Sequence, residues 1–84
     1  MPKAHKNIAV ELAELHGGKC HYCGVQTSRH VADSNPIRRT VDHVKPQSEG
    51  GPTHISNCVI ACFACNGRRG AMPYAAFKAQ FSAD

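Results

Sequence analysis

The sequence predicts a small α+β fold in which short strands and flanking helices are held together by a metal site. At 84 residues the chain is long enough for one domain, which we expect to span residues 1–84. Only 6% of the residues are aromatic and none is tryptophan, so a hydrophobic core alone would be thin. Five cysteines and six histidines could supply the missing stability by binding a metal.

The balance of charges favours a polyanionic partner. Ten lysines and arginines stand against six aspartates and glutamates, which gives a net charge of +4. The sequence has no apolar run near the roughly 20 residues of a membrane span, and the N-terminal residues lack the apolar segment of a secretory signal. We therefore expect a cytoplasmic protein. In the reducing cytoplasm, paired cysteines are more often metal ligands than disulfides.

A helix is predicted near the N-terminus, over residues 3–16. Ile8, Leu12 and Leu15 recur there at the i, i+4, i+7 spacing of one helix face. A glycine pair that begins at Gly17 ends the helix, because glycine takes the left-handed capping conformation at little cost.

Strands are predicted in the middle of the chain. Residues 39–44 are rich in β-branched side chains and are followed by Pro46, which is typical of a strand that ends there. Residues 25–36 are polar and rich in turn formers, so they are expected to form a loop. The apolar run 57–61 is either a second strand or a turn of buried helix.

Two helices are predicted in the last part of the chain. Residues 66–70 are expected to open a short helix, and residues 73–82 a final one with Pro73 in its first turn. The expected core side chains of this part are Phe63, Met72, Phe77 and Phe81.

The cysteine spacing is the strongest single signal in the sequence. Cys20 and Cys23 form one CxxC knuckle, and Cys62 and Cys65 form a second after 38 intervening residues. Four thiolates complete the tetrahedral shell of Zn²⁺ and leave no open position, so the predicted zinc is structural. The alternatives are four independent buried thiols or a redox CxxC pair. The fifth cysteine, Cys58, is interpreted as a small core residue.

Between and behind the knuckles lies a second set of chemically suggestive residues. It consists of the pair Asp42-His43, then Asn57, and then Asn66 directly after the second knuckle. Together with the lysine–proline turn, the Gly50-Gly51 loop and the sequence Arg-Arg-Gly at 68–70, this pattern resembles the HNH endonuclease family, in its zinc-stapled subgroup. The resemblance covers about residues 20–70. An asparagine at the third motif position resembles the His-Asn-Asn variant of the family.

The chemistry of these residues supports the resemblance. Hydrolysis of a phosphodiester needs a base to deprotonate water, and the ordinary pKa of histidine near 6.5 suits His43 to that task. Asp42 and Asn66 offer a sparse set of oxygen ligands of the kind that Mg²⁺ or Mn²⁺ prefers. Because side chains alternate along a strand, Asp42 is expected on the face opposite His43.

The resemblance implies further features. The core would be a ββα-metal hairpin and helix, a treble-clef-like His-Me finger, with His43 as general base and Asp42 and Asn66 as ligands of the catalytic ion. Asn57 would complete the catalytic set as a brace for the loop that orients His43. The family also contains enzymes with Ni²⁺ or Zn²⁺ at the catalytic position. A bacterial or phage-infected host cell is the source that the resemblance implies.

Four basic residues are candidates for contact with nucleic acid, and the alternative is that they lie on a solvated surface. They are Arg39, Lys45, Arg68 and Arg69.

We therefore predict a metal-dependent endonuclease that hydrolyses DNA, in preference to RNA, and nicks one strand per active site. Cleavage of both strands would need a homodimer or two nicks. One alternative is a non-catalytic zinc module that binds nucleic acid. Another is an adaptor for a phage packaging or recombination enzyme. The non-catalytic zinc module would leave Asp42, His43 and Asn66 without a role.

Overall fold

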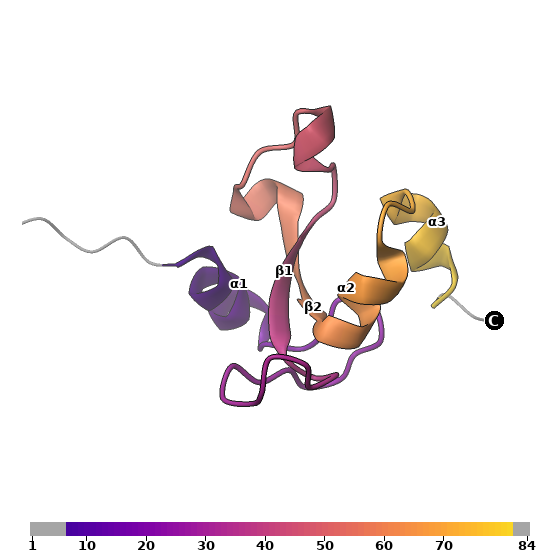
Figure 1. Cartoon of the computed structure of the whole chain (residues 1–84). Coiled ribbons are helices and arrows are strands. Elements are labelled where there is room, and N and C mark those ends of the chain that lie inside the picture. The colour runs from indigo at the N-terminus through magenta and orange to yellow at the C-terminus, as the bar shows by residue number, and fades with distance from the viewer. Residues whose placement is uncertain (1–6, 82–84) are drawn as a thin grey trace, which may run out of the picture.

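Two antiparallel strands form the centre of the structure, and helices flank them on both sides (Figure 1). The computed structural model describes residues 7–81. Its helices and strands are α1 (Ile8–His16), β1 (Arg39–His43), β2 (Cys58–Cys62), α2 (Phe63–Arg69) and α3 (Tyr74–Ala79). In Figure 1, α1 lies on one side of the sheet, and α2 and α3 lie on the other. The predicted α+β class is confirmed.

The strand register places the start of one strand beside the end of the other. Arg39 pairs with Cys62, Val41 with Ile60, and His43 with Cys58. The run whose structure the sequence left open is therefore strand β2. The connection between the strands contains two short 3₁₀ turns, Gln47–Glu49 and Ile55–Asn57, in place of a featureless loop.

Helix α1 is capped at both ends by the residues that flank it. The side chain of Asn7 accepts a hydrogen bond from the backbone N–H of Ala9 at 2.7 Å. Gly17 ends the helix in the left-handed conformation, with φ of 81°, and donates its N–H to the carbonyl of Ala13. The predicted helix began at residue 3, and residues 3–6 lie outside the described part of the chain.

Helix α2 begins at Phe63, three residues before the predicted start, because Cys62 caps it. The sulfur of Cys62 accepts a hydrogen bond from the backbone N–H of Cys65 at 3.4 Å. The second knuckle thus lies on the first turn of α2. Helix α3 falls within the predicted range 73–82, of which residue 82 lies outside the described residues. Pro73 is its N-cap, one position before the predicted one.

The sheet separates two small hydrophobic clusters. One packs Leu12 of α1 against Cys58 and Ile60, which agrees with the interpretation of Cys58 as a core residue. The other surrounds the knuckles and contains Cys20, Tyr22, Ala61, Cys62, Cys65 and Phe77. Among the helices between residues 7 and 81, none combines the length and the apolar character needed to cross a bilayer.

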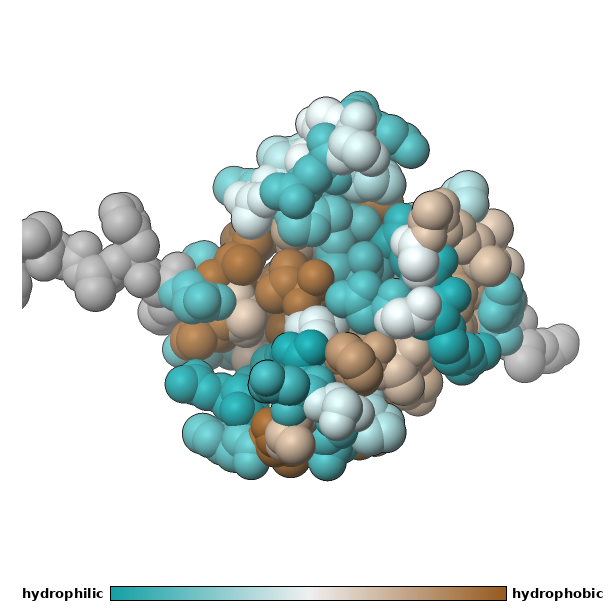
Figure 2. All heavy atoms as spheres, in the orientation of Figure 1, coloured by the Kyte–Doolittle hydropathy of each residue, from teal (hydrophilic) through white to brown (hydrophobic). Residues whose placement is uncertain are grey.

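One predicted core residue lies at the surface. Phe63 is 38% exposed, since it is the first residue of α2, and its ring packs 4.8 Å from the guanidinium carbon of Arg38. Phe77 is buried, and Met72 and Phe81 pack against its cluster. On the visible face of the molecule, the surface between β1 and α2 is hydrophilic (Figure 2). That hydrophilic strip contains the candidate site.

Candidate functional site

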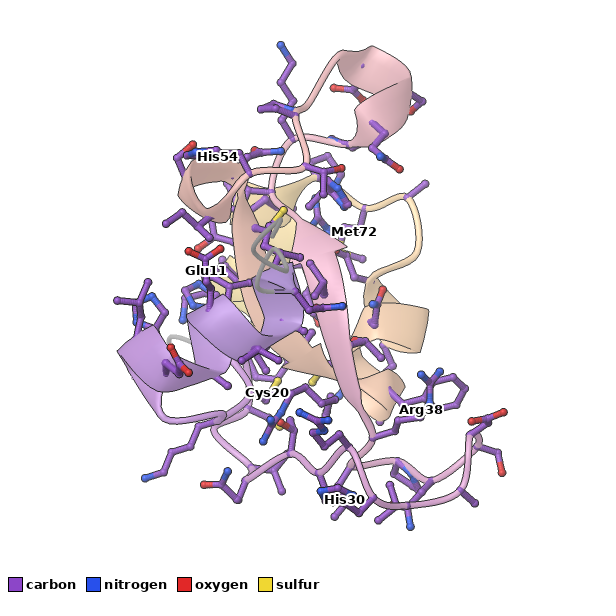
Figure 3. The ribbon with its side chains drawn as sticks, turned by 90° about the vertical axis from the view of Figure 1, so that its left-hand side faces the viewer. Glu11, Cys20, His30, Arg38, His54 and Met72 are labelled. Atoms are coloured by element: carbon purple, nitrogen blue, oxygen red, sulfur yellow. The ribbon has the colours of Figure 1, made fainter. Side chains whose placement is uncertain are left out.

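The four knuckle cysteines meet in one cluster. One of them, Cys20, is labelled in Figure 3 and lies below α1 in that view. The four sulfur atoms all lie within 4.8 Å of one another, and the sulfurs of Cys23 and Cys62 are 3.8 Å apart. A tetrahedral zinc ion with bonds of about 2.3 Å to sulfur places its ligands about 3.8 Å apart. The cluster therefore has the size that Zn²⁺ requires, and these cysteines could bind a structural zinc.

Hydrogen bonds lower the pKa of one cysteine in this cluster. Burial would raise the pKa of the Cys20 thiol, but backbone N–H groups of Cys23, Cys62 and Tyr22 lower the pKa to about 7. Burial raises the pKa of Cys65. The thiolate is the form that binds zinc, and the lowered pKa of Cys20 favours that form. The backbone N–H of His21 donates to the carbonyl of Ile60 at 2.8 Å, which fastens the first knuckle to β2.

Asp42 lies buried on β1, between the first knuckle and α2. Its Oδ2 atom accepts a hydrogen bond from Nη1 of Arg69 at 2.7 Å and a second from the hydroxyl of Tyr22. Its other oxygen, Oδ1, has no hydrogen-bond partner among residues 7–81. One half of the carboxylate is thus held by the protein, and the other half is available to a ligand.

Asn66 is fixed in a similar way on α2. Its Nδ2 donates to the hydroxyl of Thr40 at 2.9 Å, and that hydroxyl donates to the carbonyl of Ala61 at 2.7 Å. The amide oxygen of Asn66 has no partner in the described part of the chain. Asp42 and Asn66 therefore each present one uncommitted oxygen, which fits a hard divalent cation.

His43 is attached to the loop that follows β1. Its Nε2 lies 2.9 Å from the hydroxyl of Thr53, which also accepts a hydrogen bond from Nε2 of Gln47 at 3.0 Å. The neighbouring residues Asp42 and His43 thus leave β1 in different directions, towards the interior and towards the loop. Nδ1 of His43 has no partner among the residues that the structure describes.

A single cavity of about 230 Å³ nevertheless reaches Asp42, His43 and Asn66. Its lining consists of Val41, Asp42, His43, Pro46, Gln47, Asn66, Arg69 and Gly70. The structure therefore brings together the three predicted residues that can act on a phosphate, although they come from a strand and a helix.

Asn57 lies outside the cavity and joins the two ends of the loop that follows β1. Its Oδ1 accepts from the N–H of Lys45 at 2.9 Å, and its Nδ2 donates to the carbonyls of Lys45 at 3.0 Å and Pro52 at 2.9 Å. These three bonds hold the loop that carries Thr53. Gly51 packs against the same place, where a methyl group would lie 1.8 Å from the carbonyl oxygen of Lys45.

The four predicted basic residues lie in different environments. Arg68 and Lys45 are exposed, and the guanidinium of Arg68 lies 5.7 Å from the ring of Phe81. Arg39 is half-buried and donates from Nε to the hydroxyl of Thr27 at 2.8 Å.

Arg69 differs from the expectation. It is only 4% exposed, and its guanidinium is bound within the protein. We therefore assign Arg69 to the interior of the site, away from the nucleic-acid contacts.

Three residues that hold the site together were not predicted from the sequence, namely Tyr22, Thr40 and Thr53. A signal existed for two of them. Tyr22 is a hydroxyl-bearing residue inside the first knuckle, and Thr40 is two residues before Asp42, hence on the same face of β1. Thr53 lies in a loop whose path could not be predicted.

Comparison with known proteins agrees with the geometry. No curated protein is similar enough to the chain to count as a match. The family model for the HNH endonuclease matches residues 20–71, which is more than half of the chain. The matched range contains both knuckles and all residues of the cavity. The chain therefore belongs to the HNH endonuclease family, whose membership indicates nuclease activity.

Proposed function

We propose that the protein is a metal-dependent endonuclease that hydrolyses DNA phosphodiester bonds, one strand per active site. The observation that carries this proposal is the single cavity shared by Asp42, His43 and Asn66. A base and two oxygen ligands at one cavity are the groups that phosphodiester hydrolysis needs.

Metal binding and proton transfer would fall to different residues of the cavity. Asp42 and Asn66 would hold a divalent cation, with Mg²⁺ or Mn²⁺ preferred over Ni²⁺ or Zn²⁺ because both ligand atoms are oxygens. When bound, the ion supplies positive charge that stabilises the negative charge gathering on the phosphate. His43 would accept the proton of the attacking water while the water oxygen bonds to phosphorus and the bond to the 3′-oxygen breaks.

The contacts of His43 support Nδ1 as the atom that takes the proton. Nε2 is already engaged by the hydroxyl of Thr53, and only Nδ1 lacks a partner in the described range 7–81. Thr53 thus acts as a positioning residue, and Asn57 acts through it by holding the loop. His43 is half-exposed, so water can reach it.

Exposed Lys45 and Arg68 are the proposed contacts to the phosphate backbone. Each should contribute a salt-dependent part of the affinity, since binding of a cationic side chain releases counterions from DNA. Arg39, held by Thr27, is retained as a weaker candidate.

The test is nicking of supercoiled plasmid by zinc-loaded protein in EDTA, Mg²⁺, Mn²⁺ or Ni²⁺. We expect metal-dependent conversion to open circles, and a loss of several orders of magnitude in rate for His43→Ala. The variant should keep its zinc and its melting curve, because His43 is not among the zinc ligands. No cleavage in any metal by folded protein that still binds DNA would instead favour the non-catalytic binding module.

A further inference from the structure

The carboxylate of Asp42 is held by two buried side chains, which together with it form what we term the Asp42 clamp: Tyr22, Asp42 and Arg69. Tyr22 is 5% exposed and Arg69 is 4% exposed. Both donate to the same oxygen, Oδ2, and so leave Oδ1 for the cavity. A carboxylate held in this way cannot rotate freely, and its free oxygen keeps one direction.

Arg69 is itself fixed by backbone carbonyls on two elements. Nη1 donates to the carbonyl of His43 at 2.9 Å and Nη2 to that of Val44 at 3.0 Å. Nε donates to the carbonyl of Met72 at 2.9 Å. The planar guanidinium thus joins the end of β1 to the segment between α2 and α3, which holds the arginine side of the clamp in place.

Tyr22 is fixed by the zinc knuckle. It lies between Cys20 and Cys23, and its ring packs edge-on against Phe77 with the ring centres 4.8 Å apart. The position of its hydroxyl therefore depends on the knuckle that the structural zinc would hold. This hydroxyl connects the first knuckle to Asp42 at the active-site cavity.

We propose that Tyr22 is a positioning residue that sets the affinity of the active-site cavity for its divalent cation, and so couples the zinc knuckle to catalysis. The inference rests on the proposed function, because it takes Asp42 as a ligand of the catalytic ion. Groups that orient a metal ligand typically contribute about 10–100-fold to metal affinity or activity. The hydroxyl of Tyr22 stands in that position towards Asp42.

The chain offers a matched pair of variants for the test. Tyr22→Phe removes only the hydroxyl and keeps the ring that packs on Phe77. Tyr74→Phe removes a hydroxyl that lies 2.7 Å from Nε2 of His21 and does not contact Asp42. Asn66→Ala serves as the reference for weakened binding at the cavity itself.

Binding of Mn²⁺ to the full-length, zinc-loaded protein without DNA is measured from the electron paramagnetic resonance signal of the free ion. We expect about tenfold weaker binding for Tyr22→Phe, unchanged binding for Tyr74→Phe, and weakened binding for Asn66→Ala. Zinc content and melting temperature are measured for each variant, and all binding is compared below the lowest melting temperature. In nicking assays, Tyr22→Phe should need about tenfold more Mn²⁺ for half-maximal rate and should approach the wild-type rate at saturation.

Equal Mn²⁺ affinity of Tyr22→Phe and wild type, both zinc-loaded, would overturn the role of the clamp and leave the proposed function intact. Equal losses for Tyr22→Phe and Tyr74→Phe would overturn it too, because the effect would then not run through Asp42. A wild-type protein that binds Mn²⁺ at the cavity but never nicks DNA would contradict the proposed function. In that case, the Mn²⁺ affinities of the variants would still test whether the Asp42 clamp sets metal binding.

Discussion

The two candidate metal sites differ in how completely the chain surrounds them. The four-cysteine cluster takes every ligand from the protein, and three of its four cysteines are buried. The cavity beside β1 offers two uncommitted oxygens, from Asp42 and Asn66, and keeps a half-exposed histidine at its side. A closed ligand shell suits an ion that stabilises the fold, whereas an open one leaves room for water and a phosphate. With the proposed function, this difference would separate the site that stabilises the fold from the site that carries out catalysis.

The largest expected effect comes from opening the closed site. Cys62→Ala removes one zinc ligand and also the cap of α2, so we expect the protein to unfold or precipitate. Zinc content and thermal unfolding followed by circular dichroism measure this effect. Cys58→Ala, which removes a sulfur outside the cluster, is the control and should keep its zinc. A normal melting curve for Cys62→Ala would show that the cluster does not stabilise the fold.

A smaller loss of stability is expected from a substitution of Arg69, which lies between the two sites. Arg69→Met leaves the carboxylate of Asp42 buried without its ion-pair partner, which typically costs about 3–5 kcal/mol of unfolding free energy. The neighbouring Arg68→Met, at an exposed position, should change stability by less than about 0.5 kcal/mol. Urea unfolding of the two variants measures the contrast. Equal stability of both would mean that the buried ion pair contributes nothing to the fold.

The loop on the open side gives the smallest of the three effects. Gly51→Ala would bring a methyl group against the carbonyl of Lys45, and we expect a loss of about 3 kcal/mol. Gly67→Ala, on the exposed face of α2, meets no atom within 4 Å and should instead stabilise the protein by about 1 kcal/mol. Differential scanning calorimetry distinguishes the two directions. A stabilised Gly51→Ala variant would contradict the close packing of the loop on Lys45 and Asn57.

The spacing of residues along the chain was enough to predict the four-cysteine cluster. For the cavity beside β1, it predicted which residues take part but not how they are held. Two CxxC knuckles bring their four sulfurs together in any fold in which the knuckles meet. The cluster therefore depends little on how the rest of the chain packs. Arg68 and Arg69 are neighbouring arginines that the sequence alone does not distinguish. Arg68 is exposed, whereas Arg69 is buried at 4% exposure. Which of them turns inward depends on the face of α2 that packs against the sheet, and Arg69 lies on that face, where it pairs with Asp42.

The side chains that hold Asp42 could not be predicted for a related reason. Tyr22 reaches Asp42 across 20 positions of sequence, and Arg69 reaches it across 27. Such contacts depend on how α2 and the first knuckle pack together beside the sheet, and no local sequence pattern predicts that packing. The run 57–61 was ambiguous between strand and helix until its pairing with β1 decided it.

The measurement that tests the division between the two sites most directly is selective removal of metal. Zinc-loaded protein is dialysed against a low concentration of EDTA, and zinc content, melting temperature and plasmid nicking are followed together. We predict that nicking is lost while the zinc and the melting temperature stay unchanged, and that Mg²⁺ or Mn²⁺ restores nicking. Nicking that persists in EDTA, or that disappears only as zinc leaves and the protein unfolds, would contradict a separate catalytic ion at Asp42 and Asn66.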